Sequence, residues 1–392
     1  MRALPFALML LALPAPLRAQ ADPIEIRFCP AAVVRSYPLD SLRGVQSLHL
    51  QNVAAFNRGG GPVELREIEI ALLRGGEVQD VRRIAGESLM AALRGGPALQ
   101  AQGMTELLAF QFCDGRLLGG ARLAAGPAIE PGEAALVMQQ VFAWRGQRDE
   151  ARVTVTGLLA GREVRAQSSV RIDAATSATR FRWPLRNGPW LVGAGASFHT
   201  THRWAIPEEF ALDIFAVGAN GRSYRGDGAA NRDFLAYDAE VVAAADGIVA
   251  RLVTGANEAP PMLRAAGEEL GAYYARISER QAVNIAAGEA GLMGETVIVD
   301  HGNGEYSVYA HLVPGSARVA AGERVRAGQP IGRLGSSGNS TEPHLHFQVC
   351  DAPSGTSCAG IVPSFEGIEL PVSDGPRPLQ SGDLVIAVEP PR

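Results

Sequence analysis

The sequence predicts a mainly β protein built from two consecutive β-rich parts, residues 22–180 and residues 181–392. Three observations support this prediction. Glycine-rich turns separate the strand-like stretches of the first part, and six of the seven histidines follow residue 180, which places the chemistry in the second part. Apolar and polar residues also alternate with the period of a half-buried strand, for example at residues 47–51, 63–70 and 152–156.

The first 21 residues have the pattern of a signal peptide. Arg2 precedes a short apolar run at residues 4–13, and Ala19-Gln20-Ala21 supplies the small residues that signal peptidase requires. The run is about half of the ~20 residues that a membrane-spanning helix needs. We expect cleavage after Ala21, with Ala19 as the alternative. The protein is therefore expected to be exported, periplasmic or extracellular, with no integral membrane segment.

The balance of charges argues against nucleic acid as a partner. All 36 basic residues are arginine, they are scattered along the chain, and the net charge is −5. A nucleic-acid-binding protein instead concentrates positive charge on one face or along one helix.

Four cysteines in an exported chain indicate disulfides. Cys350 and Cys358 flank a short loop of Pro, Ser and Gly and are placed to close it. Cys29 and Cys113 then tie the start of the first part to its middle. The competing interpretation is a zinc–thiolate site, which lacks any Cys-x-x-Cys pair in this sequence.

We expect residues 22–180 to form an antiparallel sandwich of the immunoglobulin-like type, because several short alternating stretches follow one another. Residues 87–94 are the one expected short helix. His49 stands alone in an alternating stretch and is interpreted as a surface or cross-strand residue. No constellation of catalytic residue types occurs here, so this part is interpreted as a spacer or a binding module, with a protein as its possible partner.

The second part is also expected to be β-rich. Residues 296–309 have the pattern of a hairpin with a tight turn at Asn303-Gly304. We expect two insertions, near residues 218–238 and 255–292, which can border or cover a cleft. The second insertion contains a Glu/Ala/Leu/Tyr stretch suited to a helix at residues 261–279.

His344 and His346 are the centre of the functional prediction. They lie two residues apart in a strand-like run, so both side chains point to one face of the sheet. Leu345 and Phe347 then point the other way, into the core. Two imidazoles side by side on a sheet face offer a rigid platform for a metal and a catalytic group.

Asp213 and His311 add to this pair. Asp213 lies between Leu212 and Ile214 in an apolar strand pattern, where an unpaired charge is costly and a divalent metal is the natural partner. His311 ends the preceding hairpin strand. Two histidines and one carboxylate leave the fourth position of zinc open for water, which is the arrangement of a hydrolytic site.

Four stretches of the second part form a distinctive set. They are Val299-Asp300-His301-Gly302-Asn303-Gly304, Tyr309-Ala310-His311-Leu312, Gly328-Gln329-Pro330-Ile331-Gly332 and the stretch at residues 335–347, which ends in His344-Leu345-His346-Phe347. They resemble the lysostaphin-type (LytM-like) zinc endopeptidases of bacterial cell walls over roughly residues 190–370. The resemblance implies a compact antiparallel β fold of the duplicated hybrid motif type, one zinc ion, and cleavage of peptide bonds in the peptidoglycan stem peptide or cross-link.

The resemblance also assigns roles to individual residues. Asp213 and His346 correspond to zinc ligands. His311 and His344 match the two histidines that do not bind the metal, which deprotonate the water and stabilise the tetrahedral oxyanion. His301 lies beside a tight turn and is expected to have no catalytic role.

The third ligand departs from the family pattern. The family commonly has a histidine four residues before the aspartate, and that position is Glu209 here. A version with a longer loop carries a His-Arg pair further upstream, which His202-Arg203 resembles. We therefore expect His202 as the third ligand, with His199 and Glu209 as the alternatives.

The sequence thus predicts an exported zinc metalloendopeptidase that acts on peptidoglycan. The alternative is a catalytically degenerate relative that binds peptidoglycan or activates another wall hydrolase, because position 209 lacks the histidine. A third class is a protease of exported proteins.

Overall fold

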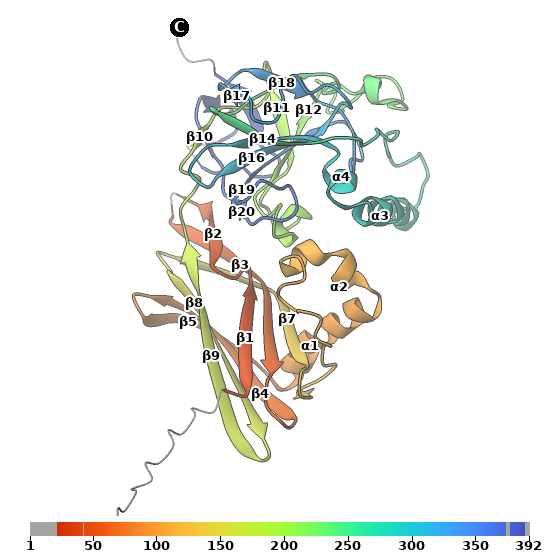
Figure 1. Cartoon of the computed structure of the whole chain (residues 1–392). Helices are drawn as coiled ribbons and strands as arrows, with labels where there is room; N and C mark the ends of the chain where they lie inside the picture. The colour runs from red at the N-terminus through yellow and green to blue at the C-terminus, as the bar shows by residue number, and fades with distance from the viewer. Residues whose placement is uncertain (1–21, 42, 374–376, 389–392) are drawn as a thin grey trace, which may run out of the picture.

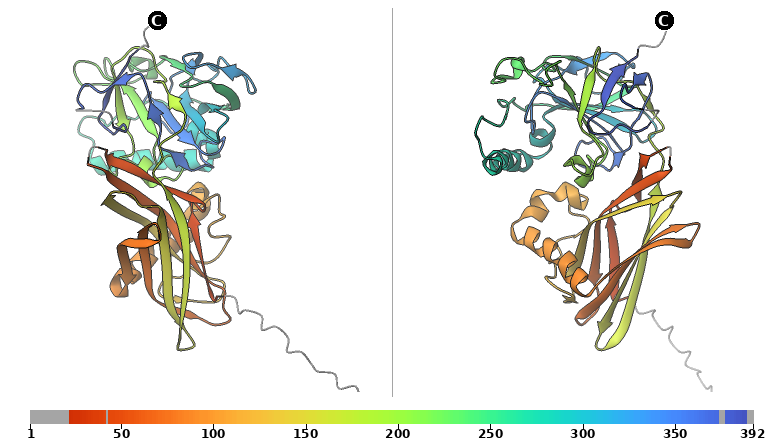
Figure 2. Two further views of the ribbon diagram at one scale, coloured as in Figure 1. Left: turned by 90° about the vertical axis from the view of Figure 1, so that its left-hand side faces the viewer. Right: turned by 180° about the vertical axis from the view of Figure 1, so that it is seen from behind.

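The computed structural model describes residues 22–41, 43–373 and 377–388, so the expected signal peptide lies outside the described residues. Two β-rich lobes are stacked end to end (Figures 1 and 2). Each lobe has its own buried apolar cluster, one formed by residues between Ile24 and Ile172 and the other by residues between Phe181 and Val385. The prediction of a mainly β protein is confirmed. The division at residue 180 stays a prediction.

The N-terminal lobe is built from two antiparallel groups of strands that a parallel pair, β2 with β9, joins into one sheet. Within the described residues the strand order is β1-β3-β2-β9-β8-β4-β5, with β7 paired to β3 and β6 paired to β4. The immunoglobulin-like connectivity stays a prediction. The strands are β1 (Ile24–Cys29), β2 (Val33–Asp40), β3 (Val45–Asn57), β4 (Val63–Arg74), β5 (Glu77–Ala85), β6 (Ala128–Ile129), β7 (Ala134–Arg145), β8 (Glu150–Leu159) and β9 (Arg162–Asp173).

The helix expected at residues 87–94 is longer in the structure and is followed by two further turns. It is α1 (Gly86–Ala101), and α2 (Met104–Leu107) and the 3₁₀ turn η1 (Ala109–Phe112) come after it. The helix continues past residue 94 because it is packed against β7. Gly96 faces Leu136 so closely that an added Cβ would lie 3.3 Å from the Cβ of that leucine. Tertiary packing here outweighs the low helix propensity of Gly95-Gly96-Pro97.

The C-terminal lobe contains a ten-stranded antiparallel sheet in the described residues, ordered β17-β14-β15-β16-β19-β12-β11-β23-β22, with β20 paired to β19. Two short pairs, β13 with β18 and β10 with β21, lie beside it. The strands are β10 (Arg180–Phe181), β11 (Trp190–Ala194), β12 (Leu212–Ala216), β13 (Glu240–Val242), β14 (Gly247–Val253), β15 (Glu295–Asp300), β16 (Tyr306–Leu312), β17 (Arg324–Val325), β18 (Pro330–Arg333), β19 (Leu345–Cys350), β20 (Gly360–Ile361), β21 (Ser364–Phe365), β22 (Ile368–Glu369) and β23 (Leu384–Ala387).

The core of this lobe lies on one face of the central strands. Leu345 and Phe347 of β19 are 0% exposed and belong to the apolar cluster, as the sequence predicts. Burying side chains of this size stabilises the fold by about 1.5–3 kcal/mol each. The residues that alternate with them, His344 and His346, therefore face the opposite side of a sheet whose position is firmly fixed.

Both expected insertions lie beside the stretch that leads into His344. In the first insertion, which contains the 3₁₀ turn η3 (Asn231–Asp233), the hydroxyl of Ser223 donates a hydrogen bond to Glu342 at 2.7 Å. The second insertion contains α3 (Leu270–Ala286) and α4 (Gly288–Met293) (Figure 1). Its helix was expected to begin at residue 261 and instead begins at residue 270. Pro260 and Pro261 break the helical pattern, and the N–H of Met262 bonds to the carbonyl of Thr341 at 2.7 Å.

Both expected disulfides are present. Cys29 is bonded to Cys113, and Cys350 is bonded to Cys358. In the described part of the chain, no helix combines the length and the apolar composition needed to cross a membrane.

The two lobes touch through several direct contacts. The hydroxyl of Tyr37 donates to the carbonyl of Leu379 at 2.7 Å, and a ring nitrogen of His49 lies 2.8 Å from the carbonyl oxygen of Arg203. Phe110 of η1 packs with the apolar residues at the end of α4. Strand β3 thus contributes to the N-terminal sheet and also contacts the second lobe.

Candidate active site

Three neighbouring strands of the C-terminal lobe bring the predicted site residues to one face. Asp213 of β12 is paired directly with His346 of β19, and His346 is paired in turn with Ala310 of β16. Residues directly opposite each other on neighbouring antiparallel strands point to the same side of the sheet. The register alone therefore aligns Asp213 with His346 and places the end of β16 beside them.

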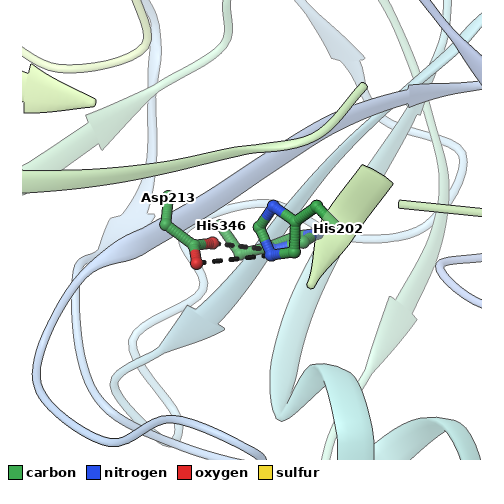
Figure 3. Close-up of side chains that lie close together, drawn as sticks. All are labelled: His202, Asp213 and His346. Atoms are coloured by element: carbon green, nitrogen blue, oxygen red, sulfur yellow. Dashed lines mark hydrogen bonds and ion pairs between the residues drawn. The ribbon is translucent and has the colours of Figure 1, made fainter. Parts of the chain in front are cut away.

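The carboxylate of Asp213 is the hub of the cluster. Its Oδ1 lies 3.0 Å from Nδ1 of His346 and 3.3 Å from Nε2 of His344, and its Oδ2 lies 3.3 Å from Nε2 of His202. Figure 3 shows Asp213, His202 and His346 converging from separate elements. The three offer ligand atoms that all lie within 4.8 Å of one another. The structure thus brings together the three residues that were predicted from the sequence to hold the metal.

His346 is oriented by Gln348, which was not among the residues predicted from the sequence. Its Nε2 lies 2.7 Å from Oε1 of Gln348, and the amide nitrogen of Gln348 donates to the carbonyl of Gly355 at 3.0 Å. The second contact fixes which end of the amide faces the imidazole. Nε2 of His346 must then carry the hydrogen, because it faces an acceptor, and Nδ1 is directed at Asp213.

His344 immediately precedes β19 and is held in a similar way. Its Nδ1 donates to the carbonyl oxygen of Glu342 at 2.7 Å, and Ser340 lies 3.2 Å away. The ring stacks on Phe215, with centroids 4.9 Å apart. These contacts direct Nε2 of His344 toward Asp213.

His311 owes its position to a bulge near the end of β16. Glu295 pairs with Leu312 and Val297 with Tyr309, so two residues of β16, Ala310 and His311, oppose one residue of β15. His311 also has φ +61°, a left-handed conformation that costs a residue with a side chain about 1–3 kcal/mol. Its Nδ1 donates to the carbonyl of Ser337 at 2.8 Å, and its ring lies 4.8 Å from that of His344.

His202 differs from the other three histidines of the cluster. It opens the 3₁₀ turn η2 (His202–Trp204), and its ring meets that of His346 edge-on at 5.0 Å. Its Nδ1 is buried and has no hydrogen-bond partner among the described residues. The turn that carries His202, and not a contact to the far side of its ring, therefore sets the position of the imidazole.

Burial and charge act on these groups in opposite directions. Burial disfavours the carboxylate of Asp213, but the histidines around it outweigh burial and hold its pKa well below the usual range. Burial likewise disfavours protonated His346 and His344, but Asp213 outweighs it, raising the pKa of His346 to about 9 and also raising that of His344. Burial, reinforced by the two neighbouring histidines, lowers the pKa of His311 well below its usual value.

The alternative ligands lie elsewhere. His199 is exposed on the loop before η2. Glu209 is buried in an ion pair with Arg203, with Oε1 2.6 Å from Nη1. Neither belongs to the group that converges on Asp213. His301, expected to be without a catalytic role, bonds to the carbonyl of Asp246 and the hydroxyl of Ser307.

The loop at residues 335–341 supports the histidine cluster through its backbone. Gly338 has φ +72°, and an added Cβ would lie 2.4 Å from the backbone nitrogen of Gly294. This close approach places Ser337 where its carbonyl accepts the hydrogen bond from His311. Only glycine meets both requirements at position 338.

The residues present fit a zinc ion. Two imidazoles and one carboxylate are a donor set typical of catalytic zinc, which keeps a fourth position open. The buried carboxylate of Asp213 needs positive charge beside it, and a divalent cation would supply that charge in place of protonated imidazoles. The contact of His346 with Gln348 is the kind of outer contact that orients a metal-binding histidine.

His49 was expected to be a surface or cross-strand residue. It is paired across the sheet with Val141, but the expectation of a surface position is wrong. The side chain is 1% exposed and lies against η2 of the other lobe, because the loop before β12 packs onto β3. A lone histidine in an alternating strand gives no local signal of a partner 154 residues away. Gln348, in contrast, lies two residues after His346, so the strand period places it on the same face.

Comparison with known proteins finds a family model, curated relatives and solved structures that match parts of the chain. Residues 278–356 match the family model described as Peptidase family M23. The murein hydrolase activator EnvC of Escherichia coli is 46% identical over 56 residues, which are 14% of this chain and 13% of that protein. The DD-carboxypeptidase/endopeptidase Mpg of Neisseria meningitidis is 46% identical over 62 residues, 16% of this chain and 14% of that protein. The solved structure of a putative M23 peptidase from Pseudomonas aeruginosa covers 57% of this chain and 77% of its own, with 15% identity and a TM-score of 0.26.

The chain thus carries a peptidase domain. That domain belongs to peptidase family M23, the lysostaphin-type (LytM-like) family. The matched stretches span only about one seventh of the length of the two curated relatives. The family match includes His311, His344 and His346, but it begins at residue 278 and so does not contain Asp213 or His202. The grouping of these last two with His346 therefore rests on the geometry of the site.

Proposed function

We propose that this protein is a zinc-dependent endopeptidase that hydrolyses peptide bonds in the peptidoglycan of bacterial cell walls. The observation that carries the proposal is the convergence of His202 from η2 with Asp213 and His346 from neighbouring strands, whose ligand atoms lie within 4.8 Å of one another. In the proposal these three residues hold one zinc ion. When bound, zinc polarises the peptide carbonyl and lowers the pKa of water toward neutrality.

The two remaining histidines then have separate tasks. His311 is neutral, and because its Nδ1 donates to Ser337, the lone pair of Nε2 is free to accept the proton of the attacking water. The proton can afterwards pass to the nitrogen of the leaving amine. His344 donates from Nδ1 to the carbonyl of Glu342 and directs Nε2 into the site. In the protonated ring, which the neighbouring Asp213 favours by raising the pKa of His344, Nε2–H can donate to the oxyanion that forms on the carbonyl.

The substrate class follows from the relatives. Mpg is named as a carboxypeptidase and endopeptidase, and EnvC as an activator of murein hydrolases. The proposal therefore places this protein at the cell wall, exported through its N-terminal segment, with the peptide part of peptidoglycan as its substrate.

A digestion of purified wall sacculi tests the proposal. We expect the protein to release shorter muropeptides, to lose this activity with a chelator, and to regain it with added zinc. His346→Ala is expected to be inactive. His199→Ala is the matched control, because it removes an exposed histidine of the same lobe and leaves the cluster intact. Full activity of His346→Ala would contradict the proposal.

The name of the EnvC relative supports a second candidate, an activator of another wall hydrolase. The two candidates differ in one experiment. An activator alone releases nothing from sacculi but increases the release by a second hydrolase, and His346→Ala leaves that effect unchanged. The complete His/Asp cluster favours the enzyme, since an activator has no need of it.

A further inference from the structure

One face of β3 carries three buried polar side chains that lie outside the apolar cluster of their own lobe. Ser47, His49 and Gln51 alternate along the strand and therefore share a face, and each is at most 1% exposed. The side chains between them, Leu48 and Leu50, point the other way into the apolar cluster of the N-terminal lobe. Buried polar groups are costly unless they are hydrogen-bonded, so this row requires a partner.

The partner is Arg203 of η2, in the other lobe. A ring nitrogen of His49, Nδ1, lies 2.8 Å from the carbonyl oxygen of Arg203, and the amide of Gln51 lies 3.4 Å from the same atom. The carbonyl can only accept, so Nδ1 of His49 carries the hydrogen. Burial lowers the pKa of His49 to about 4, which keeps the ring neutral and in that tautomer near neutral pH.

The guanidinium of Arg203 is held as firmly as its backbone. Arg203 is 0% exposed, its Nη2 donates to the hydroxyl of Ser47 at 3.1 Å, and its Nη1 donates to Glu209 at 2.6 Å. The rings of Phe198 and Phe210 lie 5.0 and 5.1 Å from its central carbon. Both ends of the residue are therefore fixed, the carbonyl by the N-terminal lobe and the guanidinium by both lobes.

The next residue of the turn is fixed to the same strand. The ring of Trp204 meets the ring of His49 edge-on at 4.7 Å, and its indole nitrogen donates to the carbonyl of Phe198 at 2.9 Å. Two of the three residues of η2 thus rest on β3. The remaining residue of the turn is His202.

The ring of His202 has no hydrogen bond of its own that would fix its position in the same way. Its Nδ1 lacks a hydrogen-bond partner among the described residues, whereas the far nitrogens of His311, His344 and His346 are all engaged. Its Nε2 lies 3.3 Å from Asp213, so the position of η2 sets this distance. A metal centre tolerates little displacement of a ligand, about 0.5 Å before function suffers.

We propose that the N-terminal lobe is a working part of the metal centre, in which Ser47, His49 and Gln51 of β3 position His202 by holding Arg203. The inference rests on the proposed function, because it assigns His202 to the metal. It gives the N-terminal lobe a task that a spacer or a separate binding module lacks. His49 is a positioning residue here and does not touch the substrate.

A different result is expected if the contact between β3 and η2 only joins the two lobes and does not position His202. If β3 only joins the lobes, changing its polar face lowers the stability of the protein and leaves the affinity for zinc unchanged. If β3 positions His202, the affinity for zinc falls while the metal-free protein still folds. The two readouts must therefore be measured on the same variants.

The experiment compares three variants of the full-length mature protein. His49→Leu removes the donor without adding bulk. His49→Asn keeps an N–H close to the place of Nδ1. Leu50→Ala is the matched control, because it weakens the same strand on the opposite face. Zinc affinity is measured by competition with a chromophoric chelator, and the unfolding temperature of the metal-free protein is measured in parallel.

We expect His49→Leu to bind zinc about 10-fold or more weakly, in line with the loss of other contacts that orient metal ligands. His49→Asn is expected to restore most of the affinity. Leu50→Ala is expected to lower the unfolding temperature and leave zinc affinity within about twofold of the wild type. Equal zinc affinity of His49→Leu and wild type overturns the inference while the proposed function stands.

A second readout separates the inference from the proposed function. In metal-free protein labelled with ¹³C-histidine, the ring signals of His202 are expected to shift in His49→Leu and to stay in place in Leu50→Ala. Unchanged His202 signals in His49→Leu overturn the inference whether or not the protein binds metal. A wild-type protein that binds no zinc overturns the proposed function instead.

Discussion

Gln348 accepts a hydrogen bond from Nε2 of His346 at 2.7 Å and thereby decides which nitrogen of that ring faces Asp213. The carbonyl of Gly355, inside the loop that Cys350 and Cys358 close, fixes the amide in turn. A chain of contacts therefore runs from the disulfide loop to the proposed metal ligand. Orientation of this kind commonly contributes 10- to 100-fold to metal affinity, as an order of magnitude of about 1–3 kcal/mol.

Replacement of Gln348 tests that chain. Gln348→Leu keeps the volume and removes the acceptor, so we expect zinc affinity to fall about 10- to 100-fold. Gln348→Glu keeps an acceptor toward His346 and is expected to retain most of the affinity. Competition with a chelator measures both. Zinc binding of Gln348→Leu that matches the wild type would show that the hydrogen bond has no role in holding the ligand.

The two disulfides are expected to contribute unequally to stability. Cys29–Cys113 joins residues separated by 84 positions, and Cys350–Cys358 joins residues separated by 8. In the chain-entropy description, closing these loops stabilises the folded state by about 4.5 and about 2.5 kcal/mol respectively. Paired Cys→Ala variants, unfolded by denaturant, measure the difference. A larger loss from removing the short loop would contradict this account.

His49 makes the stability of the protein depend on pH. Its pKa falls from 6.5 in the unfolded chain to about 4 in the folded protein, chiefly because of burial and with Arg203 opposing its charge. The folded state thus binds this proton less tightly. The stabilising contribution of neutral His49 is complete above pH 6.5 and is lost as the pH falls toward 4, by up to about 3 kcal/mol.

The variant His49→Asn isolates this contribution, because the amide does not titrate. Unfolding free energies of wild type and variant, measured between pH 7 and pH 4, are expected to converge as the pH falls. The remaining slope belongs to other groups, including His311, whose lowered pKa acts in the same direction. Parallel curves for the two proteins would show that His49 keeps an ordinary pKa.

The site residues on strands could be predicted from the sequence. The period of two places His344 and His346 on one face and Leu345 and Phe347 in the core, and the structure confirms this for all four. The same period would have pointed to Gln348. These predictions succeed because the strand period fixes the direction of each side chain locally. The apolar residues between them then indicate which face of the sheet is buried.

The parts that the sequence could not supply depend on contacts between distant segments. His49 contacts Arg203, which lies 154 positions later in the sequence, and the residues around either one do not indicate its partner. The bulge that turns His311 toward the cluster depends on how β15 and β16 pair. The grouping of His202 with Asp213 likewise arises from the packing of η2 on β3, so residue types alone left three alternatives open.

The zinc content of the purified protein tests the central claim most directly. Elemental analysis after dialysis is expected to find about one zinc per chain in the wild type and in His199→Ala, and little in His202→Ala, since three protein ligands define a catalytic zinc site. All three proteins should remain folded by circular dichroism. A His202→Ala protein that keeps its zinc, or a His199→Ala protein that loses it, would contradict the assignment of His202, Asp213 and His346 as the metal centre.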